Sequence, residues 1–290
     1  MNDTQTPEKL DWPDIRVLAF LGNGLSRHHH QGVMNEIQHC TKRGVRMTYV
    51  SFDERAEEWR QVSAGLTNFV VAASEKICFL MDGKRSWVAE DMIRTCGLAQ
   101  EHQTIVGALC PQVGFGAGWT SDWGDINEEK AALLAEGKFK EAGLPVGTND
   151  DRGHNVDRVD RNFLAVPRSV PEKLWSVLNV NGARFKAAMN EAIGVRDPAL
   201  IHKLCMLSLS EVPFSDGTCM YDFFRPISFQ GAKGGWQHLD SSFAFSERCL
   251  YCGIQPMINS HPIITNWGEH GYTFHDAQTP LDRTTGPKEG

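Results

Sequence analysis

The sequence predicts an α/β fold with a mostly parallel central sheet that is flanked by helices. Short apolar runs alternate with longer segments of helical periodicity as far as residue 110, an order that is typical of βαβ units. Turn residues such as Gly-Asn-Gly and Asp-Gly close the apolar runs. The 290 residues are 41% hydrophobic and 22% charged, as expected for a globular domain.

The elements follow one another in a regular order along this part of the chain. The run IRVLAFLG at residues 15–22 predicts the first buried strand. A helix is expected over residues 26–44, because Ser26 can cap its start and Gly44 can end it. The remaining segments predict strands at 45–52, 76–82 and 104–110, and helices at 56–74 and 87–102. The β-α-β-α-β order predicts parallel strands that are joined by right-handed crossovers.

The pattern loosens after residue 110 and then recovers. Residues 111–130 are rich in glycine and tryptophan, whereas residues 154–178 are typical of a strand, a turn and a helix. A further helix is expected at residues 182–194. We expect a single domain over residues 15–277, with a flexible leader at 1–14 and a disordered tail at 278–290.

Charge and hydropathy exclude several classes of function. The net charge of −7 argues against a protein that coats duplex nucleic acid, because such binding requires a basic surface. The longest apolar runs are much shorter than the ~20 residues that a membrane helix needs. The polar, acidic N-terminus lacks the basic start and apolar core of a secretory signal. We therefore expect a cytoplasmic protein that does not bind membranes.

Two groups of potential metal ligands occur in the sequence. Cys249 and Cys252 have the spacing of zinc ligands, but no second cysteine pair with similar spacing accompanies them. We therefore interpret them as core thiols of one helix, and a zinc-containing nucleic-acid-binding protein is the least favoured function. The run His28–His30 has the composition of a metal site, but its place at a helix start favours a surface feature.

The turn Asp82-Gly83-Lys84 raises the main functional question of this sequence. It follows the third predicted strand, just as Gly22-Asn23-Gly24 follows the first. Open α/β sheets bind ligands beyond the carboxyl ends of their strands, so both turns are candidate binding elements. The alternative is an ordinary turn between a strand and a helix, because Asp-Gly is a common turn pair.

Three segments in order resemble the GT-A family, the nucleotide-sugar-dependent glycosyltransferases with a Rossmann-type sheet. The first is similar to the family's strand, Asp-x-Asp turn, helix and following strand. The second is similar to its central strand, and the third to its catalytic helix and closing strand with a small antiparallel extension. These segments are residues 76–112, 156–175 and 223–274, and the resemblance covers about residues 15–275. It implies a donor half at about 15–112 and an acceptor half at about 113–277.

The sequence departs from the family pattern at two positions that matter for a metal. In the family, the second aspartate of the Asp-x-Asp turn and a histidine of the closing segment bind a divalent cation. This sequence has Lys84 and Asn266 at those positions. An ammonium group repels a cation and cannot be its ligand. A fixed lysine can instead stabilise a leaving diphosphate, so we expect no requirement for a divalent metal.

The resemblance implies a donor site and a catalytic base. The donor is a nucleotide sugar, with a UDP-sugar favoured, and the expected donor-binding residues are Asn23, Asp82, Gly83, Lys84, Arg85 and Asn266. Asp240 falls where the family has its catalytic carboxylate, and a base must reach the acceptor hydroxyl. Asp240 is also a plausible N-cap of the following helix. His270 is a second catalytic candidate, with a structural role as the alternative.

The predicted acceptor-binding residues are aromatic. Tryptophan faces stack on sugar rings and bases, so the expected substrate-binding residues are Trp119, Trp123 and Trp267. Packing beneath a long loop is the other interpretation of the first two. The resemblance implies an acceptor saccharide, a protein or a modified nucleic-acid base of the phage type. The alternative function is a catalytically inactive GT-A-like protein that binds sugars or nucleotides.

Overall fold

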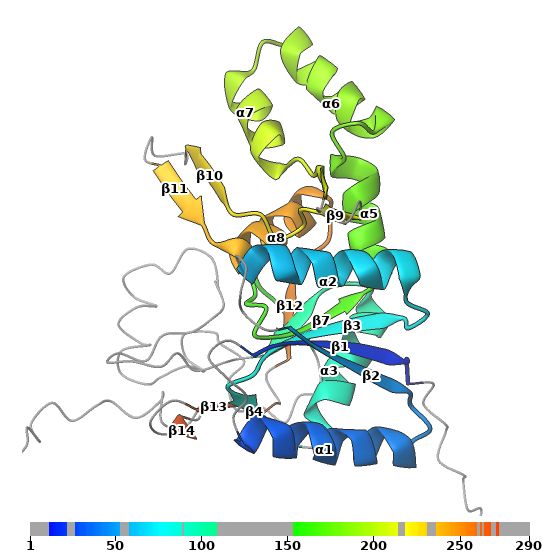
Figure 1. Ribbon diagram of the computed structural model, residues 1–290. Coiled ribbons are helices and arrows are strands. Elements are labelled where there is room, and N and C mark those ends of the chain that lie inside the picture. Colours follow the sequence, from blue (N-terminus) through cyan, green and yellow to red (C-terminus); the bar gives the residue numbers. More distant parts are fainter. Residues whose placement is uncertain are drawn as a thin grey trace, which may run out of the picture.

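The computed structural model describes the central part of the chain in several stretches. They are residues 12–21, 27–52, 58–88, 90–108, 153–213, 218–230, 236–259, 262, 264–267 and 271–272. Within them, a seven-stranded sheet forms the centre of the molecule (Figure 1). Its strands are β1 Ile15–Phe20, β2 Met47–Phe52, β3 Ile77–Asp82, β5 Val106–Ala108, β6 His154–Asn155, β7 Phe163–Pro167 and β12 Met257–Asn259.

The strand order is β2-β1-β3-β7-β5-β12-β6. Strand β1 pairs in parallel with β2 and β3, and β5 pairs in parallel with β12. Strand β7 is antiparallel to both of its neighbours, β3 and β5, and β6 is antiparallel to β12. Five strands therefore point the same way, and the chain reverses its direction of winding between β1 and β3, where an open sheet offers a ligand crevice.

Helices cover both faces of this sheet (Figure 1). They are α1 Arg27–Lys42, α2 Glu58–Ala72, α3 Asp91–His102, α5 Ser169–Leu178 and α8 Ser241–Tyr251. Two more helices, α6 Ala183–Gly194 and α7 Pro198–Leu207, pack on each other beyond α5 and away from the sheet. Alternate side chains of β1 enter two separate cores. Leu18 packs with residues of α2, α5 and α8, whereas Val17 packs with residues of α1 and α3. Burial on both faces explains why β1 is an apolar run without alternation.

Three small antiparallel sheets extend the structure. One has the order β14-β13-β4, with β4 Arg85–Ser86, β13 Thr265–Trp267 and β14 Gly271–Tyr272. The others are the pairs β8 Glu211–Pro213 with β9 Cys219–Tyr221, and β10 Ile227–Gln230 with β11 Trp236–Leu239. These features confirm the predicted class, which is a GT-A-like, Rossmann-type α/β fold with a mostly parallel sheet and a small antiparallel extension.

The predicted domain limits remain predictions, but two observations bear on them. The sheet takes β7, β6 and β12 from the expected acceptor half, so both halves share one core. Within the expected leader, the Asp14 carboxylate accepts a hydrogen bond from the Arg46 N–H at 3.0 Å and pairs with the Arg46 side chain at 3.1 Å. No helix in the described stretches is both long and apolar enough to cross a membrane.

The expectation that His28–His30 is a surface feature is wrong for its middle residue. His29 is fully buried, because its position on α1 faces the sheet. Its Nδ1–H donates to the Arg85 carbonyl at 3.1 Å, and its Nε2 accepts from the Tyr49 hydroxyl at 3.0 Å. Burial lowers the pKa of His29, so the ring is held neutral. A buried histidine of α1 thus anchors β4, the strand that follows the Asp82-Gly83-Lys84 turn.

The cysteine pair behaves as the core interpretation expects. Cys249 lies on α8 and Cys252 directly follows it, and both are buried free thiols. Burial raises the pKa of Cys252 to about 11 and that of Cys249 well above its ordinary value. Both thiols are therefore protonated at neutral pH, as expected for buried thiols in apolar surroundings.

Glu36 makes the stability of the fold depend on pH. It is fully buried on α1, and its Oε2 accepts a hydrogen bond from the Trp87 Nε1–H at 2.9 Å. Burial raises the pKa of Glu36 from 4.5 to about 7, with Asp91 adding to the effect and Arg43 opposing it. The folded protein keeps the proton while the unfolded chain loses it, so stability falls as the pH rises from about 4.5 to about 7.

Glu36→Gln should remove this pH dependence, because glutamine keeps the hydrogen-bond acceptor but does not ionise. We expect the free energy of unfolding of the variant, relative to wild type, to rise by about 3 kcal/mol between pH 4.5 and pH 8. Urea titrations at the two pH values measure this difference. Glu101→Gln, an exposed change on α3, is the control. An equal effect of Glu36→Gln at both pH values would contradict the prediction.

Candidate functional site

The Asp82-Gly83-Lys84 turn lies at the carboxyl edge of the sheet, directly after β3. The Lys84 N–H donates to Asp82 Oδ1 at 2.8 Å, and the Gly83 N–H donates to the Phe20 carbonyl at 2.8 Å. A Cβ atom on Gly83 would lie 3.0 Å from the Leu21 Cα, so this close approach of the backbones requires glycine. The turn is therefore fixed against the end of β1, with the Lys84 side chain exposed.

Strand β13 brings the closing segment of the chain to this turn. Asn266 pairs with Arg85, and Thr265 pairs with Ser86, in antiparallel register. Directly opposed Cα atoms in such a pair are about 4.5–5.5 Å apart, so Asn266 stands next to the residue that follows Lys84. Trp267 continues this strand and pairs with Gly271 of β14. Two positions that are far apart in sequence, Arg85 and Asn266, thus belong to one small sheet, and Lys84 directly precedes it.

Asp160 joins three segments at the same edge, although the sequence analysis did not select it. Its Oδ1 accepts from the Ser242 hydroxyl at 3.0 Å, and its Oδ2 accepts from the Asn162 side-chain amide at 2.5 Å. The Asn162 carbonyl in turn accepts from the Asp82 N–H at 3.2 Å. Burial raises the pKa of Asp160, against the opposing effect of the positive charges of Arg161 and Arg85. This carboxyl group therefore links the turn, the start of β7 and the start of α8.

Arg161 places a buried positive charge beside the end of β1. Its guanidinium lies over the Phe20 ring, 5.7 Å from the centroid, and pairs with Glu58 at the start of α2. Phe20 also stacks on Phe52 of β2, with 5.5 Å between the ring centroids. Within the described residues, Nη1 of Arg161 is buried and has no hydrogen-bond partner. Among the described residues, this edge therefore holds a buried donor that lacks a hydrogen-bond partner.

Asp240 lies at the start of α8, and both predicted roles agree with its geometry. Its Oδ1 accepts from the Phe243 N–H at 3.0 Å, so it is the N-cap of the helix. Its side chain is also exposed, and it stands two residues before Ser242, which contacts Asp160. An N-cap carboxylate keeps a second oxygen for an acceptor hydroxyl. Capping is therefore confirmed, and catalysis stays a prediction.

The position of Asp160 and Arg161 in the sequence, just before an apolar strand, is not enough to assign them to the site. Both residues lie shortly before the apolar strand FLAVP, which is β7, with Asn162 between them and the strand. Residues before a strand normally lie at the opposite edge from those that follow one. Because β7 is antiparallel to β3, its first residues lie instead at the carboxyl edge of the parallel strands. The direction of β7 is a tertiary property, so only the structure assigns these residues to the site.

The described residues at this edge do not fit a divalent metal. Magnesium and manganese take several hard oxygen ligands, but one Asp82 oxygen already accepts the Lys84 N–H, and the exposed lysine adds positive charge. Across the described stretches, no group of three or more His, Cys, Asp or Glu side chains could hold a metal ion. The independence from metal remains a prediction, and no step proposed below passes through one.

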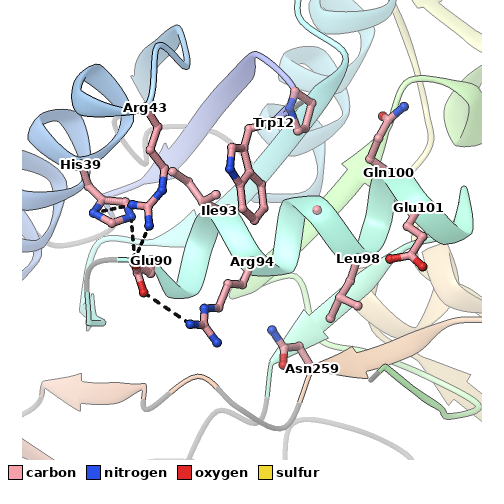
Figure 2. A pocket seen from close by; sticks show the side chains of 12 residues that line it. Trp12, His39, Arg43, Glu90, Ile93, Arg94, Leu98, Gln100, Glu101 and Asn259 are labelled. Carbon is pink, nitrogen blue, oxygen red and sulfur yellow. Dashed lines mark hydrogen bonds and ion pairs between the residues drawn. The ribbon is translucent and has the colours of Figure 1, made fainter. Parts of the chain in front are cut away.

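A separate cavity of about 640 Å³ lies along α3 (Figure 2). At one end, Glu90 pairs with Arg43, with His39 at 3.5 Å and with Arg94 at 3.4 Å. Figure 2 shows Trp12 between this charged end and the end that carries Gln100 and Glu101. None of the residues that line the cavity belongs to the Asp82-Gly83-Lys84 turn. This cavity is therefore a different feature from the site at the carboxyl edge.

Several predicted site residues lie outside the described part of the chain. These are Asn23, Trp119, Trp123 and His270. The side chains of Asn266 and Trp267 are likewise not described, although their backbone pairing is. The residues that the structure brings together at the carboxyl edge are thus Asp82, Gly83, Lys84, Arg85 and the backbone of Asn266, with Asp240 linked to them through Ser242 and Asp160.

The fold of the chain is a GT-A-like α/β fold with a mostly parallel sheet. No protein-family model matches the sequence, and no curated protein matches it. Among solved structures, A197 from STIV is similar at 11% identity and a TM-score of 0.43, over 87% of this chain and 86% of that one. GalNAc-T7 with UDP, GalNAc and Mn²⁺ is similar at 9% identity and a TM-score of 0.44, over 91% of this chain. The match covers 46% of the GalNAc-T7 chain, less than half of its length.

Proposed function

We propose that this protein is a glycosyltransferase that moves a sugar from a nucleotide sugar to an acceptor hydroxyl without a bound divalent metal. The observation that carries the proposal is the pairing of β13 with β4, which joins Asn266 to the Asp82-Gly83-Lys84 turn. The two segments in which the sequence departs from a metal-binding pattern are thereby neighbours. In this proposal, the lysine and the asparagine both offer hydrogen-bond donors to a diphosphate.

In this proposal, the donor lies across the carboxyl ends of β1 and β3. Lys84 contacts the diphosphate, with Arg85 and Asn266 beside it, and Asp82 accepts hydrogen bonds from hydroxyl groups of the donor sugar or the ribose. The proposal adds Arg161, whose unpaired Nη1 beside Phe20 supplies a further donor near the end of β1. A UDP-sugar is the proposed donor, and Gly83 lets the two backbones approach closely enough to form this surface.

The reaction is a displacement at the anomeric carbon of the donor sugar. The acceptor oxygen forms a bond to that carbon, while the bond from the carbon to the diphosphate oxygen breaks. Asp240 takes the proton of the acceptor hydroxyl, and Lys84 stabilises the negative charge that develops on the leaving nucleoside diphosphate. Asp160 holds the start of α8 through Ser242, so it acts as a positioning residue for Asp240.

Resistance to chelation tests the metal-independent part of this proposal. We expect release of UDP from UDP-sugars, and transfer to an acceptor, to continue at an unchanged rate in excess EDTA. The same assay with added Mn²⁺ or Mg²⁺ gives no increase, because Lys84 already supplies the positive charge. Complete loss of activity in EDTA, restored only by a divalent cation, would overturn metal independence while leaving transferase activity intact.

A binding measurement, combined with the release assay, distinguishes an active transferase from the catalytically inactive alternative. A thermal-shift series with UDP- and GDP-sugars shows binding as stabilisation of the folded protein. Stabilisation together with nucleotide release supports a transferase. Stabilisation without any release, in the presence of saccharide, protein and oligonucleotide acceptors, would support a sugar- or nucleotide-binding protein instead.

A further inference from the structure

Trp236 is a large aromatic residue on the surface of the hairpin β10–β11. It is 71% exposed, which exceeds every other large hydrophobic side chain in the described stretches. It begins β11, and the chain passes directly from the end of this strand through Asp240 into α8. Figure 1 shows β11 running toward α8 from the hairpin end. An exposed tryptophan therefore stands on the strand that leads to the candidate catalytic carboxylate.

Strand geometry places three functional side chains in one row. Alternate residues of an extended strand point to the same side, so Trp236, His238 and Asp240 share a face. All three are exposed, whereas Leu239 between the last two is 5% exposed and belongs to the core. The Asp240 backbone is itself extended, with φ −63° and ψ 179°, so the alternation continues to it. The row spans roughly 13 Å at ~3.3 Å per residue.

Neighbouring elements hold this row in place. Ser228 of β10 pairs with His238, and its Oγ lies 2.9 Å from His238 Nδ1 in a hydrogen bond. Trp236 meets His202 of α7 with the ring planes at 80° and the centroids 5.8 Å apart. In the described part of the chain, the His202 Nε2 is shielded from solvent and has no hydrogen-bond partner. The tryptophan therefore contacts His202 at one edge and is otherwise largely open to solvent.

The chemistry of the row fits a neutral saccharide. An indole face packs against the apolar face of a sugar ring, and the histidine and carboxylate can hydrogen-bond to its hydroxyl groups. Residues 236–240 contain no lysine or arginine, so the row offers no positive charge to a phosphate backbone. A row of this length accommodates more than a single ring.

We propose that Trp236, His238 and Asp240 form the acceptor subsite and that the acceptor is a neutral oligosaccharide. This inference rests on the proposed transferase function, because it assigns the acceptor side of the same reaction. The sugar whose hydroxyl reacts lies at Asp240, and a preceding ring of the same saccharide stacks on Trp236. His238 binds a hydroxyl between them.

The test compares Trp236→Ala and Trp236→Phe with wild type. Transfer from UDP-sugars to maltotriose, cellotriose and chitotriose is measured together with donor hydrolysis in the absence of acceptor. With the trisaccharide that wild type uses, we expect Trp236→Ala to raise the acceptor KM about tenfold and to lower the ratio of transfer to hydrolysis about tenfold. Trp236→Phe keeps an aromatic face and recovers part of the loss. Ile193→Ala, at a residue of α6 that is 54% exposed, is the control for removing a surface hydrophobic group.

The outcomes separate this inference from the transferase proposal itself. Wild-type hydrolysis and transfer with no effect of Trp236→Ala on acceptor KM would overturn the acceptor subsite alone. Transfer to oligothymidylate but to none of the trisaccharides would also overturn it and identify a nucleic-acid acceptor. Absence of both hydrolysis and transfer would overturn the proposal that this protein is a transferase. In that case calorimetry tests whether Trp236, His238 and Asp240 bind a saccharide. Trisaccharide binding that Trp236→Ala weakens would support a saccharide site, and absence of trisaccharide binding would overturn it.

Discussion

Lys84→Met is expected to lower the transfer rate by about a hundredfold or more in metal-free buffer. Removal of one group that stabilises a developing negative charge typically costs about 10²–10³ in rate. Methionine keeps the unbranched stem of the lysine side chain as far as Cε but lacks the charged Nζ. The turn itself should survive, because its hydrogen bonds use the backbone N–H groups of Gly83 and Lys84. The measurement is kcat for UDP release in EDTA.

Lys84→Arg is the matched control for charge, and we expect it to retain more activity than Lys84→Met. Lys84→Asp gives the turn a second carboxylate, so any activity of this variant should require Mn²⁺. An unaltered rate in Lys84→Met would contradict the assignment of the lysine to the diphosphate. Circular dichroism and the melting temperature show whether the variants are folded.

Asp240→Asn is expected to reduce transfer by about 10²–10⁴, the usual contribution of a general base. Asparagine caps helices about as well as aspartate, and the Asp240 oxygen accepts from the Phe243 N–H, so the fold and donor binding should be retained. Asp240→Ala removes the base and the cap together. It should therefore show the same loss of rate and, in addition, about 1 kcal/mol less stability.

These variants separate catalysis from capping at Asp240. Rates are compared with the free energy of unfolding and with donor affinity for each protein. Full turnover in Asp240→Asn would show that the base lies elsewhere, and the neighbouring carboxyl group of Asp160 would be the next to replace. A loss of rate that follows the loss of stability, and appears only in Asp240→Ala, would leave Asp240 with its structural role alone.

The parallel part of the fold could be predicted because its signals are local. Strands β1, β2 and β3 are apolar runs with sharp ends, and α1 and α2 have periodic patterns between them. Each such unit has one favoured handedness, which limits the arrangements in space, but the order β2-β1-β3 is seen only in the structure. The ends were less precise, since the predicted helix at residues 87–102 begins at Asp91 in the structure.

The rest of the site depends on pairings between distant segments, which local patterns do not reveal. The direction of β7 brings Asp160 and Arg161 to the carboxyl edge, and the pairing of β13 with β4 brings Asn266 there. The resemblance to a known family linked Lys84 with Asn266, but the residue chemistry alone did not. His29 shows the opposite difficulty, because one of three identical neighbours is buried and the sequence gives no reason to choose it.

The pairing of Asn266 with Arg85 also has a consequence for the synthesis of the protein. The last described strand of the large sheet, β12, ends at Asn259, so every described strand of this sheet precedes β13 in the chain. Strand β4 can pair with β13 only after the chain has been synthesised as far as Trp267. A chain that ends before this point would thus contain the strands of the large sheet but lack the pairing that joins β4 to β13.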